Sequence, residues 1–303
     1  MSSRIFVDGQ VGTTGLGIAR RLAAAGGFSL VTLPEANRKN LQARVEAMGR
    51  ADLTVLCLPD DAAREAVTIA PSGARILDAS TAHRVAEGWV YGFAEALPGQ
   101  AERIASAKRV ANPGCYATGA IALLRPLTAL GLLTAEAPLC INAVSGYSGG
   151  GKVMITDHEI TGGPAFELYA LGLRHKHLPE IMHYSGLARA PVFVPSVGHF
   201  PQGMLVCIPL YLEQLTTPCS AVQLTEAYAD YYAGKVNILV HRGIWGANLD
   251  PQALNDTDQL EIFVAANEEA GQVVLIARLD NLGKGASGAA VQNIKLMLGI
   301  ENG

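Results

Sequence analysis

The sequence predicts the α/β fold class, with two domains: a parallel-sheet domain first, then an α+β domain whose sheet is mostly antiparallel. Three observations support this. Strand-like and helical segments alternate through the first 113 residues, glycines follow the first strand, and longer strand candidates dominate after about residue 135. A chain of 303 residues, half of them hydrophobic and 17% charged, can form two sizeable cores.

The first part of the chain has a βαβαβ pattern. Four short apolar runs predict strands: 4–9, 28–33, 51–59 and 74–81. The segments between them have helical spacing, and the third opens with Asp60 and Asp61, a favourable helix start. Strands that alternate with helices in this way form a parallel, doubly wound sheet.

A glycine-rich turn stands between the first predicted strand and its helix. The sequence there is GQVGTTG, a GxxGxxG pattern in place of the commoner GxGxxG. A pyrophosphate must approach backbone N–H groups at a helix N-terminus, and side chains would block it. The turn therefore predicts a Rossmann-type dinucleotide site, and a purely structural turn is the alternative. The expected cofactor ligands are Gly9, Gly12, Thr13, Thr14 and Gly15.

The choice between NAD and NADP stays open at this point. Glu35 lies about 20 residues after the last of these glycines, where a carboxylate would bind a ribose 2′-hydroxyl. Arg38 and Lys39 follow it, and their cationic groups could hold a 2′-phosphate. A solvated loop of mixed charge is the structural alternative.

The later part of the chain changes character. Its strand candidates are 138–144, 204–212, 236–241, 259–267 and 272–280, and the last two read as a hairpin. Helices are expected inside 164–186 and over 220–233, and the tail returns to helical spacing. We expect a dinucleotide-binding domain over 1–113, with the C-terminal helix of about 284–303 packing back on it. A catalytic and oligomerisation domain is expected over 114–283.

Composition excludes several classes of function. The net charge is −4 and no basic run is present, which argues against nucleic acid as a partner. No apolar stretch reaches the roughly 18 residues of a membrane span. Five cysteines without a CxxC motif suggest a reducing cytoplasm. We also expect a homo-oligomer, a dimer or tetramer, because a sheet with one helical layer leaves an apolar face; 204–212 and 272–280 are the strands expected at the partner.

The segment ANPGCYATGA contains the candidate nucleophile. Asn112 can serve as a helix N-cap and Pro113 as the first helical residue, so that Cys115 lies in the first turn. A thiol there experiences the positive end of the helix dipole, which favours the thiolate. A small residue at a tight turn is the alternative. The other cysteines lack this setting: Cys57, Cys140 and Cys207 lie in apolar runs, and Cys219 follows a proline.

A catalytic thiol needs a proton partner. RHKHLPEI contains the densest histidine cluster, with His175 and His177, although a surface loop or a metal site could share this pattern. His199 and His83 are further candidates. The glycine-rich SGYSGGGK, which ends in Lys152, could cradle a phosphate or could be a linker.

Together these segments resemble the N-acetyl-γ-glutamyl-phosphate reductases of arginine biosynthesis. The match rests on ANPGCYATGA, YGFAEALP (91–98), HKHLPEI (175–181) and DNLGKGASGAAVQN (280–293), and it covers residues 5 to 297. VDGQVGTTGL and FVPSVG are most similar to the family's short form. The resemblance implies that NADPH reduces N-acetyl-γ-glutamyl phosphate, a small-molecule acyl phosphate, to N-acetylglutamate semialdehyde with release of phosphate.

The resemblance also implies roles for individual residues. Cys115 would be the nucleophile, His175 the acid/base and Glu180 a positioning group. The family favours NADP, and hence Arg38 and Lys39 as cofactor ligands. Further cofactor residues would be Ser80 and Asn281, and substrate residues would be Asn112, Ser148, Gly149, Lys152 and Lys176. The family often has arginine in place of Lys176, which puts a bidentate anion contact there in doubt. No metal is implied.

Three other functions are compatible with parts of the pattern. Aspartate-semialdehyde dehydrogenase shares the fold and the thioester chemistry but resembles 175–181 and 280–293 less. A lysine-pathway reductase would act on a longer, carrier-bound aminoadipyl phosphate. A non-catalytic dinucleotide-binding sensor would need neither Cys115 nor His175.

Overall fold

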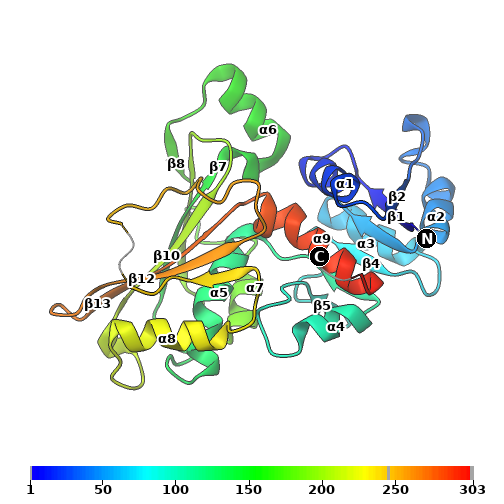
Figure 1. Ribbon diagram of the computed structural model, residues 1–303. Helices are drawn as coiled ribbons and strands as arrows, with labels where there is room; N and C mark the ends of the chain where they lie inside the picture. Colours follow the sequence, from blue (N-terminus) through cyan, green and yellow to red (C-terminus); the bar gives the residue numbers. More distant parts are fainter. Residues whose placement is uncertain (1, 244–245, 301–303) are drawn as a thin grey trace. The chain divides into compact units, whose positions relative to one another are not determined.

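Backbone contacts divide the chain into two compact units in this computed structural model, which describes residues 2–243 and 246–300 (Figure 1). The first unit comprises Met1–Pro113 and Ala286–Gly303, and the second comprises Gly114–Gly285. Each unit has its own sheet.

The first unit contains a six-stranded sheet in the order β2-β1-β3-β4-β6-β5. Its strands are β1 (Ser3–Asp8), β2 (Phe28–Val31), β3 (Leu53–Leu56), β4 (Ile76–Asp78), β5 (Val90–Tyr91) and β6 (Arg109–Ala111). All five pairings are parallel, which confirms the predicted parallel sheet. The strand order reverses beside β1, and in such sheets ligands bind at the carboxyl ends of the strands at this switch point.

Helices cover both faces of this sheet. Its helices are α1 (Thr13–Ala25), α2 (Leu41–Arg50), α3 (Asp60–Ile69), α4 (Gln100–Ser106) and α9 (Gly288–Leu298). One apolar cluster joins the sheet to α1, α4 and α9, and a second joins it to α2 and α3. The C-terminal helix α9, red in Figure 1, packs against α1 and α4.

Three elements of this unit lie in a segment for which the sequence analysis predicted none. β5 has two residues, β6 has three and α4 has seven. Elements this short carry too few residues for a period of 2 or 3.6 to stand out. β6 pairs with β4, β5 pairs with β6, and α4 packs against α9, so these elements depend on partners that are distant in sequence.

The second unit contains a seven-stranded mixed sheet in the order β11-β12-β13-β10-β7-β9-β8. Its strands are β7 (Cys140–Gly146), β8 (Phe166–Leu168), β9 (Val192–Gly198), β10 (Met204–Tyr211), β11 (Ile238–Val240), β12 (Leu260–Asn267) and β13 (Gln272–Leu279). Four pairings are antiparallel and two are parallel. The expected hairpin is present as β12–β13, with Asn267 opposite Gln272.

Strands β8 and β9 were not predicted. Proline inside an apolar run normally argues against a strand, and Pro195 lies in the middle of β9. Here β9 nevertheless pairs in parallel with β7 along its whole length, so the tertiary context prevails over the local signal.

Several helices accompany the sheet of the second unit. They include α5 (Cys115–Ala129), α6 (Gly151–Thr156), α7 (Leu178–Ser185) and α8 (Ala221–Tyr231). α5 contacts β10 and β13, α8 contacts β12, and α7 packs on α5 (Figure 1). Gly119 of α5 approaches Val206 so closely that a Cβ there would lie 2.7 Å from its side chain.

Alternate residues of β10 and β13 face away from α5. Cys207 pairs with Ile276, and Pro209 pairs with Val274, and all four are half-buried or exposed while their neighbours along the strands are buried. We call these four residues the outer row. They form an apolar surface on the helix-free side of the β10–β13 pair.

None of the described helices is long and apolar enough to cross a membrane.

Candidate active site

The structure distributes the expected site residues over both units. In the first unit they are Gly9, Gly12, Thr13, Thr14 and Gly15 before and within the first turn of α1, Arg38 and Lys39 after β2, Ser80 after β4, and Asn112 after β6. In the second unit they are Cys115 at the start of α5, Ser148, Gly149 and Lys152 after β7, His175, Lys176 and Glu180 around the start of α7, and Asn281 after β13.

The glycine turn leaves the start of α1 uncovered. Gly9 has φ +85°, and a Cβ there would collide with the carbonyl oxygen of Cys57. A Cβ on Gly15 would lie 2.7 Å from the carbonyl oxygen of Gly9. Gly12 is the N-cap, and no side chain caps the helix. A Cβ on Gly12 would come no nearer than 3.5 Å to any other atom, so this side of the turn is open to an anion.

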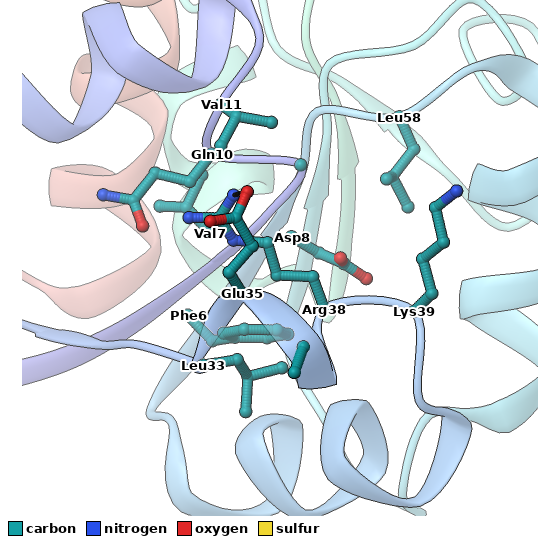
Figure 2. Close-up of a pocket in the computed structure, with 12 residues that line it drawn as sticks. Phe6, Val7, Asp8, Gln10, Val11, Leu33, Glu35, Arg38, Lys39 and Leu58 are labelled. Carbon is teal, nitrogen blue, oxygen red and sulfur yellow. Dashed lines mark ion pairs between the residues drawn. The ribbon is translucent and has the colours of Figure 1, made fainter.

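A cavity of about 460 Å³ adjoins this turn within the first unit (Figure 2). Its lining includes Gly9 and Gln10 of the turn together with Glu35, Arg38 and Lys39. Arg38 Nη1 lies 3.5 Å from Glu35 Oε1, and most of the Glu35 side chain is exposed. Glu35 and Arg38, the two side chains that could distinguish NAD from NADP at the ribose, therefore line one cavity and form an ion pair with each other.

A buried ion pair stands at the end of β1 beside the same cavity. Arg44 Nη2 lies 2.8 Å from Asp8 Oδ2, and both side chains are buried. Burial raises the pKa of Asp8, while Arg44 opposes this rise. Arg44 Nη1 also lies 3.6 Å from Glu65. The sequence analysis missed this pair because its two residues are 36 positions apart, on a strand and a helix.

Ser80 belongs to a small polar cluster at the end of β4. Its hydroxyl donates to Asp78 Oδ2 over 2.7 Å, and its amide donates to Asp78 Oδ1 over 2.9 Å. His83 Nδ1 lies 2.6 Å from Asp78 Oδ2, and the His83 ring stacks on Trp89. Ser80 is buried, and its hydroxyl already has a partner within the unit.

Cys115 is the first residue of α5. The expected cap is wrong in detail: Gly114, not Asn112, is the N-cap, and Pro113 precedes the helix. The reason is that Asn112 extends β6, with its amide donating to the carbonyl of Asp78 and its Nδ2 donating to the carbonyl of Ala286. The expectation that Cys115 lies in the first helical turn agrees with its position in α5.

Glu180 and Gly285 are among the residues that lie at the start of α5 beside Cys115. The Glu180 carboxylate, only 1% exposed, accepts a hydrogen bond from the Gly114 amide over 3.1 Å. A Cβ on Gly285 would lie 2.9 Å from Cys115 Cβ, so glycine is required where this segment passes the thiol. The side chain of Cys115 remains half-buried.

His175 lies just before α7, whose N-cap is His177. The His177 amide donates to His175 Nδ1 over 3.1 Å, and His175 Nε2 lies 3.4 Å from the Tyr169 hydroxyl. The His175 ring packs edge-on against Tyr116 and Phe193. The Tyr169 hydroxyl is also close enough to the Cys115 thiolate for that charge to affect its pKa. Tyr169 therefore lies near both expected catalytic residues, Cys115 and His175.

The glycine-rich segment after β7 is held by Asn281. Asn281 Nδ2 donates to the Ser148 hydroxyl over 2.9 Å, and Asn281 Oδ1 accepts from the Gly203 amide over 2.7 Å. The amides of Tyr147 and Ser148 donate to the carbonyls of Phe200 and Pro201. These two amides are thus not available to a phosphate. Gly149 and Lys152 are exposed, as is Lys176 near α7.

The other cysteines lack the setting of Cys115. Burial raises the pKa of Cys57 to about 12, and it also raises the pKa of Cys207 and of Cys219. Within the described part of the chain, no group of three or more His, Cys, Asp or Glu side chains is placed to hold a metal ion.

The sequence analysis missed two tyrosines of this site. Tyr116 directly follows Cys115, and Tyr169 lies six residues before His175. Neither belongs to a spacing pattern that signals chemistry. Only the fold brings them close enough for each to affect the pKa of the other.

Comparison with known proteins gives one consistent set of relatives. Residues 115–281 match the family described as "Semialdehyde dehydrogenase, dimerisation domain". An "N-acetyl-gamma-glutamyl-phosphate reductase 2" of Pseudomonas putida is 53% identical over 97% of this chain and 96% of its own length. An "N-acetyl-gamma-glutamyl-phosphate reductase" of Brucella ovis is 49% identical over 99% of this chain and all of its own length.

Solved structures with a similar fold are more distant in sequence. Aspartate semialdehyde dehydrogenase II of Vibrio cholerae, complexed with ASA, has a TM-score of 0.73 at 16% identity and covers 98% of each chain. The Candida albicans aspartate semialdehyde dehydrogenase with NADP has a TM-score of 0.68 at 13% identity, again over 98% of each chain. At these identities the likeness concerns the fold.

The contact between Glu180 and Gly114 predicts an asymmetric response to substitution. Glu180→Ala leaves the buried Gly114 amide without this acceptor, and we expect it to lower the free energy of unfolding by about 1–3 kcal/mol. Glu180→Gln keeps an oxygen that can accept the bond, and it should lose less. Urea denaturation of both variants measures the difference. Equal losses would show that the carboxylate charge, and not the bond, is what matters.

Proposed function

The chain belongs to the semialdehyde dehydrogenase family, among the N-acetyl-γ-glutamyl-phosphate reductases, and we propose that it reduces N-acetyl-γ-glutamyl phosphate with NADPH. The products are N-acetylglutamate 5-semialdehyde and phosphate, in arginine biosynthesis. Full-length relatives at 49–53% identity favour this substrate over aspartyl phosphate or a carrier-bound aminoadipyl phosphate. A non-catalytic sensor would not need the arrangement around Cys115.

One observation carries the proposal: Cys115 is the first residue of a helix that has no side-chain cap. First-turn amides of a helix have no intrahelical acceptor, and they stabilise negative charge on a thiolate or an oxyanion. Glu180 accepts a hydrogen bond from Gly114 at this helix start, and the His175 ring packs edge-on against Tyr116, the second residue of the helix. This combination suits a nucleophile whose reaction generates anions.

The reaction begins with attack of the Cys115 thiolate on the acyl carbon. The carbon–sulfur bond forms, the carbon–oxygen bond to phosphate breaks, and phosphate leaves with the electron pair and later takes a proton from solvent. When bound, NADPH supplies a hydride to the carbonyl carbon of the thioester. Amides of the first turn of α5 and the His175 ring stabilise the oxyanion. The oxyanion then collapses to the aldehyde and returns the thiolate.

The first unit offers a site that fits a dinucleotide. The open turn at Gly12 and the uncapped start of α1, including the amides of Thr13 and Thr14, suit a pyrophosphate. The adjoining cavity offers Arg38 and Lys39 for a 2′-phosphate, which supports NADP. The Candida albicans structural neighbour is described with NADP, in line with this choice.

We assign the remaining expected residues two kinds of role. Lys152, Lys176 and Gly149 are exposed and could meet the substrate's anionic groups directly. Asn112, Asn281 and Ser80 are buried and bonded within their own units, which supports positioning roles instead. Ser148 lies between these cases, since its hydroxyl accepts from Asn281 and keeps its own proton to donate.

The outer row of β10 and β13 supports a homo-oligomer. Its residues Cys207, Pro209, Val274 and Ile276 present an apolar strip, and the matched family is described as a dimerisation domain. We propose that this strip lies against a second copy of the chain. A reducing cytoplasm suits an enzyme whose nucleophile is a thiol.

The role of Cys115 can be tested by labelling and by assay. Brief alkylation with iodoacetamide should modify Cys115 much faster than Cys57 or Cys207, because burial raises the pKa of both other thiols. Cys115→Ser should abolish nearly all turnover while NADPH still binds. The assay runs in reverse, with phosphate, NADP and either N-acetylglutamate semialdehyde or aspartate semialdehyde. Substantial turnover by the serine variant, or preference for the aspartate compound, would contradict the proposal.

The cofactor preference depends on Arg38. Arg38→Ala should weaken NADPH binding about 10–100-fold, the loss of a charge-assisted bond worth about 1.5–3 kcal/mol, and leave NADH nearly unchanged. Glu35→Gln is the matched control: it should weaken neither cofactor, because the Glu35 carboxylate faces Arg38 and solvent. Fluorescence titration measures both. If Glu35→Gln weakens NADH binding instead, the Glu35 carboxylate binds the ribose 2′-hydroxyl and the assignment to Arg38 is wrong.

The oligomer contact can be tested at Ile276. Ile276→Glu places a charge in the outer row and should shift sedimentation at micromolar concentration toward the monomer, because burying an unpaired carboxylate is costly. Val222→Glu, at an exposed position of α8, is the control and should leave the assembly intact. A wild-type monomer, or an Ile276→Glu variant of unchanged mass, would refute this interface.

A further inference from the structure

The ion pair of Asp8 and Arg44 stands at the cavity of the first unit and has no part in the function proposed above. Asp8 is the last residue of β1, and it lines the cavity (Figure 2). Arg44 Nε donates to Asp8 Oδ2 over 2.9 Å, and Arg44 Nη2 lies 2.8 Å from the same oxygen. Both side chains are more than nine-tenths buried. A buried carboxyl group therefore stands in the wall of a cavity that we assign to an anionic cofactor.

The charged side chains that line the cavity nearly cancel one another. Arg38 and Lys39 are positive, whereas Glu35 and Asp8 are acidic. Most of the Glu35 side chain is exposed, so it can turn toward solvent at little cost. Asp8 is 5% exposed and lies at the end of a central strand, so its charge is a fixed feature of the wall. A 2′-phosphate, with a charge of about −1.5 to −2 at neutral pH, would be repelled by an unpaired Asp8.

Arg44 supplies the positive charge that compensates Asp8. A guanidinium and a carboxylate in direct contact act at a distance as a neutral pair. The other acidic group near Arg44 is Glu65 of α3, whose carboxylate lies 3.6 Å from Arg44 Nη1 and is largely exposed, so solvent screens it. Cys57, which experiences the Asp8 charge, stays protonated because burial raises its pKa to about 12. Arg44 therefore has the main effect on the field of Asp8.

A purely structural role explains this pair less well. Breaking a buried ion pair is costly, but such a pair adds little stability compared with apolar residues of the same size. Helix α2 already has apolar anchors, because Ala47 and Met48 pack in one core cluster with Phe6 of β1. The attachment of α2 to the sheet thus does not require a charged pair. Its position beside the cavity suggests an electrostatic role instead.

We propose that Arg44 sets the preference for NADP over NAD through Asp8: by compensating the Asp8 charge, it makes the cavity acceptable to a 2′-phosphate. This proposal deepens the proposed function and rests on its assignment of the cavity to the cofactor. Arg38 and Lys39 would meet the phosphate directly, whereas Arg44 acts without touching it. NAD carries a hydroxyl group in place of this phosphate, so its binding should depend much less on the Asp8–Arg44 pair.

The test changes the charge of the pair in steps and measures cofactor preference. NADPH and NADH are titrated by fluorescence, and the preference is the Kd of NADH divided by the Kd of NADPH. Asp8→Asn removes a negative charge, and the preference should rise about three- to tenfold. Arg44→Met removes a positive charge, and the preference should fall by a similar factor. The double variant restores the charge balance and should return close to the wild-type preference.

The titrations are done at a mildly alkaline pH of about 8.5. Burial raises the pKa of Asp8, and loss of Arg44 removes the group that opposes this rise. An alkaline buffer favours the ionised carboxylate, so that Arg44→Met exposes its full effect on the phosphate. Arg50→Met is the matched control: it removes the same charge from an exposed position of the same helix and should change the preference less than about twofold.

Several outcomes would overturn the role of Arg44. One is an unchanged preference in Asp8→Asn, and another is equal weakening of both cofactors in Arg44→Met, as a structural defect would cause. If the double variant loses as much preference as Arg44→Met, then Arg44 binds the phosphate itself and does not act through Asp8. Should Arg44→Met fail to fold, Asp8→Asn decides alone, and Arg44→Lys, which keeps the charge, should keep the wild-type preference.

The proposed function fails in a different way. If the wild-type protein does not prefer NADPH, or if Arg38→Ala leaves NADPH binding unchanged, the assignment of the cavity to NADP is wrong, and the role of Arg44 falls with it. If both of those results are as expected but the preference does not follow the charge of the Asp8–Arg44 pair, only the role of Arg44 is wrong.

Discussion

The hydrogen bond from the Gly114 amide to the Glu180 carboxylate connects the two parts of the proposed catalytic machinery. It joins the residue before Cys115 to the first turn of α7, the helix whose N-cap is His177 and which begins just after His175. A short helix of eight residues thus positions the histidine and anchors the start of α5 at once. Because this bond is buried, breaking it would leave the Gly114 amide without the acceptor that Glu180 provides. It adds to the packing of α7 on α5, which also sets where the thiol and the imidazole lie.

The segment that follows β13 contains a glycine and an asparagine, Gly285 and Asn281, whose positions have a structural reason. Gly285 must lack a side chain because Cys115 is immediately beside it, and Asn281, four residues earlier, holds the Ser148 turn. Both follow β13, whose long pairings with β10 and β12 fix where the strand ends. The open face of that pair, the outer row, carries no catalytic group. Strand β13 therefore leads into the candidate site at its end, and its outer face contributes to the proposed contact with a second copy of the chain.

Local sequence patterns were sufficient to predict the sheets and the setting of the candidate nucleophile. They were insufficient to predict contacts between residues that are distant in the sequence. The parallel sheet, the β12–β13 hairpin and the special setting of Cys115 all follow from periodicity, glycine placement and elimination among five cysteines. β9 was missed because Pro195 lies within it, and Asn112 was mistaken for a cap because its bonds to Ala286 and Asp78 come from distant segments. Tyr116 and Tyr169, each of which affects the pKa of the other, lie far apart in the sequence. No local signal encodes such a pair.

The start of α1 in the first unit and the start of α5 in the second share one feature, a glycine N-cap. α2 and α8 are capped by the side chains of Asn40 and Ser220, which accept from amides of the first turn. α1 and α5 have Gly12 and Gly114 at the same position, both extended and both without a side-chain cap. A capping side chain is worth about 1 kcal/mol to a helix, and its absence leaves first-turn amides for another anion. In α1 that anion would be a pyrophosphate, and in α5 the thiolate or oxyanion of Cys115. Helices α3, α4, α6, α7 and α9 also lack a side-chain cap, and it is at α1 and α5 that the proposed chemistry uses the first-turn N–H donors.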